Sequence, residues 1–208
     1  GARLAFVLFH LSDFASDPLS AVNPFGAGGH FGIMGMNLYG GVLLSIICGY
    51  IYVRRRKQSL WHVFDIFAPT VALGIGITRI GCFLNGCCWG KISYKLGVRF
   101  PLKDNPPAYA QQVIDGLIPK SALCSLPVIP TQLYEAVACL IIFFLLLFTE
   151  KYRRFDGFLF WVFILIYSAF RFTIEYFRYY DTNFIYGFFT VSQIISIVWL
   201  VLALVILG

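Results

Sequence analysis

The sequence predicts an all-α fold, a polytopic bundle of transmembrane helices, and three observations lead to this prediction. Of the 208 residues, 59% are hydrophobic and only 12% are charged, whereas about a quarter of a soluble domain is charged. The mean hydropathy is +0.79. Several apolar runs reach the roughly 20 residues that a helix needs to cross about 30 Å of hydrocarbon. We therefore expect one membrane domain over residues 1–208.

Five apolar runs are expected to cross the membrane as helices, separated by polar or basic connections. In chain order they are Phe31–Val53, Leu60–Leu84, Thr131–Phe148, Gly157–Phe177 and Gly187–Leu207. The first residues, Gly1–Leu11, have the composition of a helix end, and the chain does not start with Met. We expect about six helices, the first of them truncated because N-terminal residues are missing.

The connections predict the orientation, because short cytoplasmic loops carry an excess of Lys and Arg. Two short connections, Arg54–Lys57 and Glu150–Arg154, contain seven basic residues. The longest polar stretch, residues 85–130, contains six of the nine prolines and only five basic residues. We therefore predict that both short connections are cytoplasmic and that residues 85–130 form an extracytoplasmic loop subdomain.

This topology brings charged residues from three helices into the outer half of the membrane. They are Arg79, Glu135, Arg171, Glu175 and Arg178. A charge at the bilayer centre costs about 2.5–3.5 kcal/mol on insertion scales, so such residues need a reason. Together with Tyr167, the last three follow the spacing i, i+4, i+8, i+11, which predicts one helix face. Asp65, at the cytoplasmic end of its run, is expected to be structural.

The convergence of arginines and carboxylates in one leaflet predicts a site for an anionic lipid headgroup, because Arg presents a rigid fork of donors that matches phosphate. Each of the three arginines could instead have a purely structural role. Arg178 could snorkel to the headgroups, Arg171 could pair along its helix with Glu175, and Arg79 could only hold helices together. Either close approach to a ligand or helix capping and packing would explain three nearby glycines. They are Gly81, Gly86 and Gly90.

Four stretches, taken together, resemble the bacterial prolipoprotein diacylglyceryl transferases. They are GARLAFVLF (Gly1–Phe9), DIFAPTVALGIGITRIGCFLNGCCWG (Asp65–Gly90), PTQLYEA (Pro130–Ala136) and YSAFRFTIEYFR (Tyr167–Arg178). Their order and spacing cover nearly the whole chain. The resemblance implies seven helices, so the first helix of the family is expected to be absent from this chain.

The resemblance also implies a reaction and its partners. The diacylglyceryl group of phosphatidylglycerol is transferred to the lipobox cysteine thiol in prolipoprotein signal peptides, in a bacterial inner membrane and without a cofactor. The implied catalytic residues are Arg79, Arg171, Glu175, Tyr39 and Glu135. The implied substrate-binding residues are Arg79, Asn85, Gly90, Gln132, Tyr134, Tyr167, Arg171 and Arg178. The net charge of +6 lies in short clusters beside apolar runs, which indicates membrane lipid rather than nucleic acid.

The sequence departs from the family pattern at four positions. Cys82 replaces the signature Asn, Cys87 replaces the signature Glu, and Ile129 replaces a His. Tyr39 replaces the family's proposed proton acceptor, also a His. An unperturbed Tyr has a pKa near 10 and is a poor base, so we expect Tyr39 to donate a hydrogen bond to lipid. The acceptor of the thiol proton stays open between Tyr39 and the two carboxylates of the site.

The six cysteines allow three interpretations. Cys82, Cys87 and Cys88 have C-x4-C-C spacing, but no His or carboxylate stands beside them, so we expect no metal. A disulfide from this group to Cys124 is plausible in an oxidising compartment. Small buried apolar side chains are an equally good reading, and this role suits two cysteines best. They are Cys48 and Cys139.

Three rival functions stay open. A lipid or anion transporter would also need arginines in the outer leaflet, although the inverted repeats or broken helices of such proteins are not visible. A membrane thiol oxidoreductase would depend on Cys82, Cys87 and Cys88, and would lose activity on Cys→Ser rather than Arg→Ala changes. A relative with the same lipid site and a changed acceptor is the third.

Overall fold

The computed structural model describes residues 7, 38–103, 105–179, 185–186 and 189–208. The chain divides into two compact units, Gly1–Leu60 and Trp61–Gly208. In the first unit, helix α3 spans Leu38–Arg55 and ends in the basic pair Arg54 and Arg55. It accounts for the described part of the predicted run Phe31–Val53. The predicted helix end Gly1–Leu11 lies outside the described residues, except for Val7.

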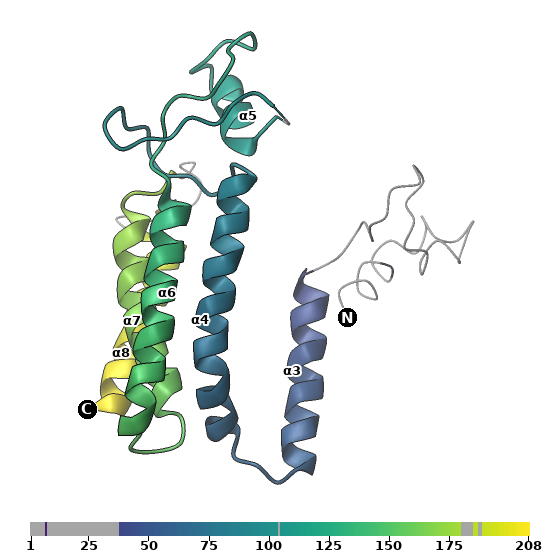
Figure 1. Cartoon of the computed structure of the whole chain (residues 1–208), viewed down its shortest axis with the longest axis vertical. Helices are drawn as coiled ribbons and strands as arrows, with labels where there is room; N and C mark the ends of the chain where they lie inside the picture. Colours follow the sequence, from purple (N-terminus) through teal and green to yellow (C-terminus); the bar gives the residue numbers. More distant parts are fainter. Residues whose placement is uncertain (1–6, 8–37, 104, 180–184, 187–188) are drawn as a thin grey trace. The chain divides into compact units, whose positions relative to one another are not determined.

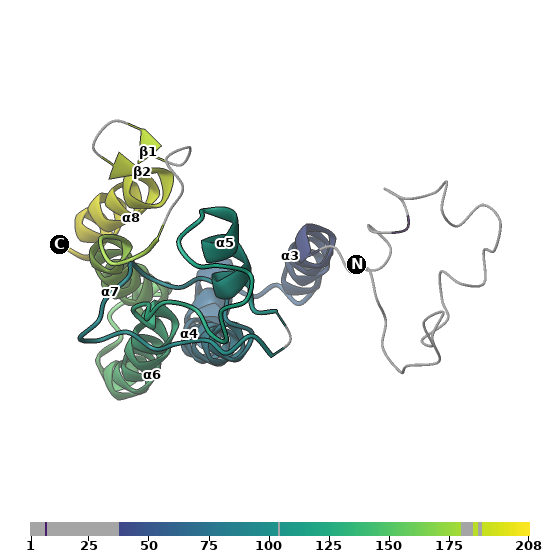
Figure 2. The same ribbon diagram turned by 90° about the horizontal axis from the view of Figure 1, so that it is seen from above.

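The second unit contains four long apolar helices, which confirms the predicted all-α membrane bundle. They are α4 (Leu60–Leu84), α6 (Thr131–Thr149, extended by the 3-10 helix η2, Glu150–Tyr152), α7 (Phe158–Glu175) and α8 (Val191–Leu207). Figure 1 shows them side by side, and Figure 2 shows that α8, α7, α6 and α4 follow one another in that order. Among the described helices, three are long and apolar enough to cross a membrane, and α8 is a shorter apolar helix.

Small residues let α4 approach its neighbours closely, as is typical of helices packed in membranes. An added Cβ at Gly76 would lie 3.4 Å from both the Ala136 carbonyl oxygen and the Cys139 Cβ on α6. The core between α4, α6 and α7 combines such small residues with large aliphatic and aromatic ones. Its buried members are Ala68, Ala72, Ile142, Leu146, Leu159 and Phe163.

A buried carboxylate on α4 caps the start of α7. Asp65 is 1% exposed, and its Oδ2 and Oδ1 accept hydrogen bonds from the backbone N–H groups of Gly157 (2.8 Å) and Phe160 (3.0 Å). Gly157 has a φ of 98°, in the left-handed region that favours glycine. The first N–H groups of a helix lack partners within the helix, so Asp65 satisfies two of them from another helix.

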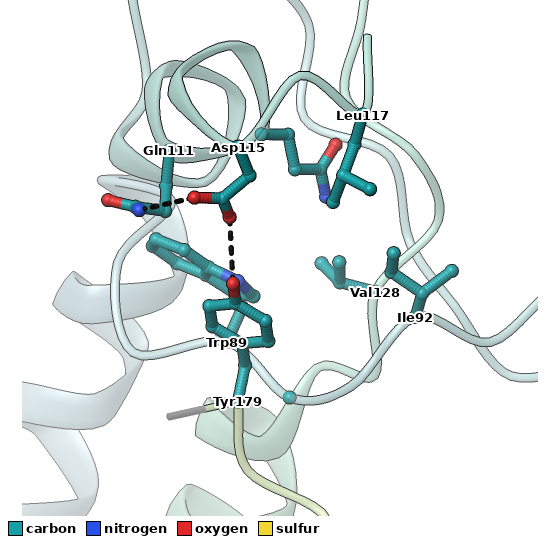
Figure 3. A pocket seen from close by; sticks show the side chains of 9 residues that line it. Trp89, Ile92, Gln111, Asp115, Leu117, Val128 and Tyr179 are labelled. Atoms are coloured by element: carbon teal, nitrogen blue, oxygen red, sulfur yellow. Dashed lines mark hydrogen bonds between the residues drawn. The ribbon is translucent and has the colours of Figure 1, made fainter. Parts of the chain in front are cut away.

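The polar stretch between α4 and α6 contains a short helix that the sequence analysis did not predict, α5 (Pro107–Ile114). Figure 3 shows how α5 is tied to the chain that follows α7. The Tyr179 hydroxyl donates to Asp115 Oδ2 (2.7 Å), and the Tyr179 ring stacks on Trp89 with centroids 6.3 Å apart. A two-stranded antiparallel hairpin, β1 (Ile185–Tyr186) and β2 (Phe189–Thr190), precedes α8 and is a small exception to the all-α prediction.

Candidate active site

An ion pair between α4 and α6 forms the centre of the candidate site. Arg79 Nε lies 3.0 Å from Glu135 Oε2. Glu135 is on the second turn of α6 and is 2% exposed. An unpaired carboxylate at such a position would cost several kcal/mol of desolvation. The pair therefore explains why each of the two apolar helices contains a charge.

Helix α7 contributes three residues to the same network. The Tyr167 hydroxyl donates to Glu135 Oε1 (3.0 Å). One turn later, Arg171 NH1 lies 4.0 Å from Glu135 Oε2, and Arg171 NH2 lies 3.0 Å from Glu175 Oε2. Residues separated by i, i+4 and i+8 share one helix face. In the structure, Tyr167 and Arg171 contact Glu135 on α6, and Glu175 joins the network through Arg171.

Thr190 is a member of this network that the sequence analysis missed. The Thr190 hydroxyl donates to Glu175 Oε1 (2.9 Å). Thr190 is also the N-cap of α8, because its hydroxyl oxygen accepts a hydrogen bond from the backbone N–H of Gln193. The spacing T-x-x-Q before an apolar run is the signature of a capping box. That signal was present in the sequence and indicates the helix start, but it does not reveal the contact with Glu175.

Arg79 combines a buried partner with partial exposure. Its Nε lies 3.0 Å from Glu135 Oε2. The Arg79 side chain is 18% exposed. A guanidinium has five N–H donors in a planar fork, and the terminal pair matches two oxygens of a phosphate. Glu135 thus holds Arg79 in place within the site.

The turn after α4 is fastened to the first turn of α6. Gln132 Nε2 donates to the Cys87 carbonyl oxygen (2.6 Å), and the Thr131 hydroxyl donates to the Cys88 carbonyl oxygen (3.0 Å). Gln132 is 1% exposed, and its Oε1 has no hydrogen-bond partner among the described residues. Thr131 and Gln132 therefore fix the backbone of the segment that follows α4. The sequence analysis predicted a different role for Gln132, the binding of substrate.

Gly90 is required by close packing rather than by an unusual backbone angle. A Cβ at this position would lie 2.5 Å from the Phe177 carbonyl oxygen and 2.8 Å from Thr131 Cγ2. Both distances are shorter than van der Waals contact, and Gly90 also forms a β-bridge with Arg178. Gly90 therefore allows the turn after α4 to lie against the end of α7.

We expect Gly90→Ala to destabilise the protein by about 1–3 kcal/mol, the usual cost of overpacking. Gly81→Ala is the matched control, because an added Cβ at Gly81 meets no heavy atom within 4 Å outside its own helix. Thermal unfolding of both variants in detergent checks this. Equal midpoints for the two variants would show that Gly90 is not needed for packing.

The structure describes the places of four further predicted site residues in the chain. Tyr134 is exposed on α6, and Asn85 is exposed in the turn after α4. Arg178 was expected on the same face of a helix as Arg171, but α7 ends at Glu175 and Arg178 lies beyond it, in a β-bridge with Gly90. Tyr39 is in the first turn of α3, in the other compact unit, and its side chain lies outside the described residues.

A cavity of about 340 Å³ begins at Arg171 and extends between α4, α7 and α8. Tyr167, Ser168 and Arg171 line it on the side of the network, and Phe163 and Trp199 line its apolar part. Arg171 and Phe163 are eight residues apart on α7, which corresponds to about 12 Å along a helix. The volume of the cavity is in the range of ligand pockets. The lining of this partly open pocket combines a cationic group with apolar side chains.

All six cysteines are free thiols in the structure. Burial, only partly offset by a hydrogen bond with Asn85, raises the pKa of the Cys87 thiol to about 11. Catalytic thiols in oxidoreductases instead have a lowered pKa, which supplies the reactive thiolate near neutral pH. The environment of Cys87 therefore does not favour the thiol oxidoreductase as a function.

Comparison with known proteins identifies one family that matches the whole chain. The family model described as prolipoprotein diacylglyceryl transferase matches residues 1–208. The chain belongs to the prolipoprotein diacylglyceryl transferase family. This membership confirms the resemblance found in the sequence, and with it the expectation of a transferase enzyme.

Individual relatives support the assignment to the prolipoprotein diacylglyceryl transferase family. A phosphatidylglycerol–prolipoprotein diacylglyceryl transferase of Campylobacter hominis is 33% identical over 208 residues, covering 97% of this chain and 67% of the relative. Proteins of the same name from Geobacter sulfurreducens and Escherichia coli are 32% and 30% identical. They cover 94% and 95% of this chain, and the chain covers 67% and 68% of their lengths.

Proposed function

We propose that this member of the prolipoprotein diacylglyceryl transferase family transfers the diacylglyceryl group of phosphatidylglycerol to the lipobox cysteine of prolipoproteins. The thiol sulfur attacks the glycerol carbon that bears the phosphate. A C–S bond forms, the C–O bond to phosphate breaks, the thiol loses its proton, and glycerol phosphate leaves. The protein would span a bacterial inner membrane several times, with its site toward the outer leaflet.

One observation carries this proposal: two arginines from different helices, Arg79 and Arg171, converge on the buried carboxylate of Glu135. Negative charge develops on the leaving phosphate during the reaction, and preorganised donors aimed at that charge supply much of the catalysis in such sites. Arg171 provides a second guanidinium beside the same carboxylate. In this proposal, the two arginines stabilise the phosphate, and Glu135 and Glu175 hold the arginines in place.

The cavity below Arg171 supports a lipid substrate. A phosphatidylglycerol molecule has an anionic phosphate next to two apolar chains. Its phosphate would lie at the arginines, and part of one acyl chain would lie against the apolar lining at Phe163 and Trp199. Tyr167 is held by its bond to Glu135 and lines the junction of the two regions. The contacts of Tyr167 suit it to orient the lipid.

Arg171 provides the direct test of the proposed function. We expect Arg171→Ala to reduce transfer of labelled diacylglyceryl from phosphatidylglycerol to a lipobox peptide by about 100-fold or more, because one phosphate-binding group is lost. The matched control is Arg99→Ala, since Arg99 is an exposed arginine in the polar loop. Circular dichroism and detergent unfolding would verify that both variants fold.

Three results would count against the proposal. Folded wild-type protein without transfer activity would contradict the reaction itself and favour lipid binding or transport. Equal losses in Arg171→Ala and Arg99→Ala would show that overall positive charge, rather than the site, drives the reaction. Retained activity with a different thiol peptide and none with the lipobox peptide would indicate a changed acceptor.

A further inference from the structure

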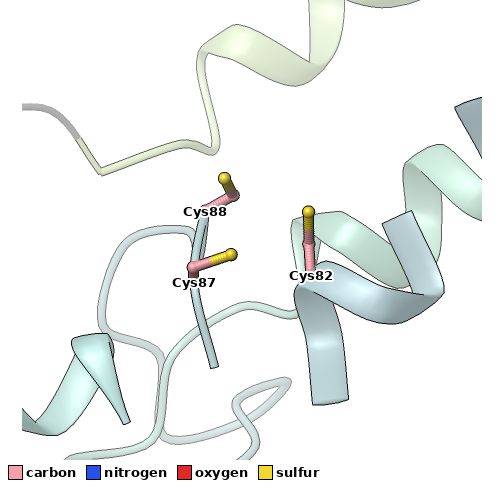
Figure 4. Close-up of side chains that lie close together, drawn as sticks. All are labelled: Cys82, Cys87 and Cys88. Atoms are coloured by element: carbon pink, nitrogen blue, oxygen red, sulfur yellow. The ribbon is translucent and has the colours of Figure 1, made fainter. Parts of the chain in front are cut away.

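Three thiols gather where α4 ends, beside the ion-pair network but not part of it. Cys82 is on the last turn of α4, and Cys87 and Cys88 are in the following turn. Their sulfur atoms all lie within 4.8 Å of one another, and all three residues are partly buried. Figure 4 shows the three side chains lying side by side, with the Cys87 sulfur directed toward Cys82.

The spacing of the sulfur atoms is close to that of a metal–thiolate site. A Zn–S bond of about 2.3 Å gives S···S separations of roughly 3.8–4.0 Å in tetrahedral or trigonal geometry. Since no pair here is further apart than 4.8 Å, each sulfur needs to move by less than about 1 Å. Rotation of the cysteine side chains can supply such a shift without a change in the backbone.

The backbone of the turn already holds two of the thiols in position. Cys88 has a φ of 62°, in the left-handed region, which costs a non-glycine residue about 1–2 kcal/mol. In extended backbone, the side chains of Cys87 and Cys88 would point to opposite sides. The unusual angle instead lets both lie near Cys82. Gln132 and Thr131 fix this turn by binding the two cysteine carbonyl groups.

The surrounding charge suits a bound cation with three thiolates. A divalent ion with three thiolate ligands has a net charge of −1. Arg79 is three residues before Cys82 on α4, so the two side chains are neighbours on the helix surface, and its guanidinium has the opposite sign. The unmet acceptor Oε1 of Gln132 is in the same turn region. A water molecule bound to the ion could donate a hydrogen bond to such an acceptor.

We infer that Cys82, Cys87 and Cys88 bind a thiophilic d10 metal ion, with Zn²⁺ as the first candidate and water as its fourth ligand. A ligand set made only of sulfur favours Zn²⁺ or Cu⁺ over the hard ions Mg²⁺ and Ca²⁺. This revises the sequence-based expectation of no metal, which rested on the absence of a neighbouring His or carboxylate. The site does not depend on the proposed transfer reaction.

Cobalt binding tests the proposal independently of activity. The full chain, purified in detergent and reduced, would be titrated with Co²⁺, which gives thiolate-to-cobalt charge-transfer absorption and the visible bands of a four-coordinate ion. We expect one Co²⁺ per chain, displaced by one equivalent of Zn²⁺. A parallel titration with Cu⁺ against a colorimetric chelator distinguishes the two d10 ions.

Single cysteine variants locate the site. Cys82→Ser, Cys87→Ser and Cys88→Ser should each weaken Co²⁺ binding by about 100-fold or more, because even outer-shell changes cost 10–100-fold. The matched controls are Cys48→Ser and Cys124→Ser, which should bind as wild type does. No charge-transfer band in the reduced wild-type protein, or a band that survives in all three variants, would overturn the proposal.

Discussion

Replacing Arg79 by alanine should abolish diacylglyceryl transfer, with a loss of about 100-fold or more. The terminal donors of Arg79 are the ones we assign to the leaving phosphate, and removal of one such group typically costs 10²–10³ in rate. The same change leaves the Glu135 carboxylate, 2% exposed, without its closest partner. Breaking a buried ion pair in this way costs about 3–5 kcal/mol of stability, so activity and folding must be separated.

Arg79→Lys makes that separation. Lysine keeps the positive charge and can still donate to Glu135, but it lacks the planar fork that binds two phosphate oxygens. We expect Arg79→Lys to unfold close to wild type in a detergent titration, and its transfer rate to stay at least about tenfold lower. A lysine variant as active as wild type would show that charge alone, and not the fork, is needed.

Replacing Asp65 by alanine should cause the largest loss of stability away from the site. Two backbone N–H groups at the start of α7 would lose their acceptor in a buried environment. Each unsatisfied buried group costs about 1–3 kcal/mol, so we expect a loss of about 2–5 kcal/mol. Detergent or thermal unfolding measured by circular dichroism would record it.

Asp156→Ala is the matched control for Asp65→Ala. Asp156 is close in sequence to the same helix start and pairs with Arg153 (3.0 Å), but its side chain is 43% exposed. Exposed ion pairs contribute little. Asp65→Asn should lie between the two, because an amide keeps one acceptor oxygen and loses the charge. Similar unfolding midpoints for Asp65→Ala and Asp156→Ala would contradict the capping role.

The long helices were predictable because their apolar length is a property of local sequence. The predicted run Leu60–Leu84 has the same bounds as α4, and the predicted start of α6 at Thr131 is observed. The shared face of Tyr167, Arg171 and Glu175 also followed from helical periodicity. These features depend on residues close in the chain, so one sequence is enough to specify them.

Features that depend on turns were not predictable in the same way. Helix α5 and the hairpin before α8 are too short for a clear periodic signal, and the end of α7 at Glu175 separates Arg178 from Arg171. The spacing of Cys82 and Cys87 alone gives no sign that their sulfur atoms meet. The local part of the return is a helix C-cap, in which Gly86 has a φ of 68° and the Cys87 N–H donates to the Cys82 carbonyl oxygen (3.0 Å). Gln132, which is 45 residues further along the chain, then donates to the Cys87 carbonyl oxygen.

The pairing of Arg79 with Glu135 has a consequence for assembly of the protein in the membrane. The two residues are on different helices, separated by the whole polar loop, so their ion pair forms only when α4 and α6 associate. Each helix must therefore insert with a charge that has no partner yet. The favourable insertion free energy of its apolar residues must exceed the unfavourable free energy of inserting that charge. Neutralisation comes only when inserted helices associate. The ion pair would then select the correct helix neighbour, and a chain that had paired wrongly would keep an uncompensated charge within the lipid.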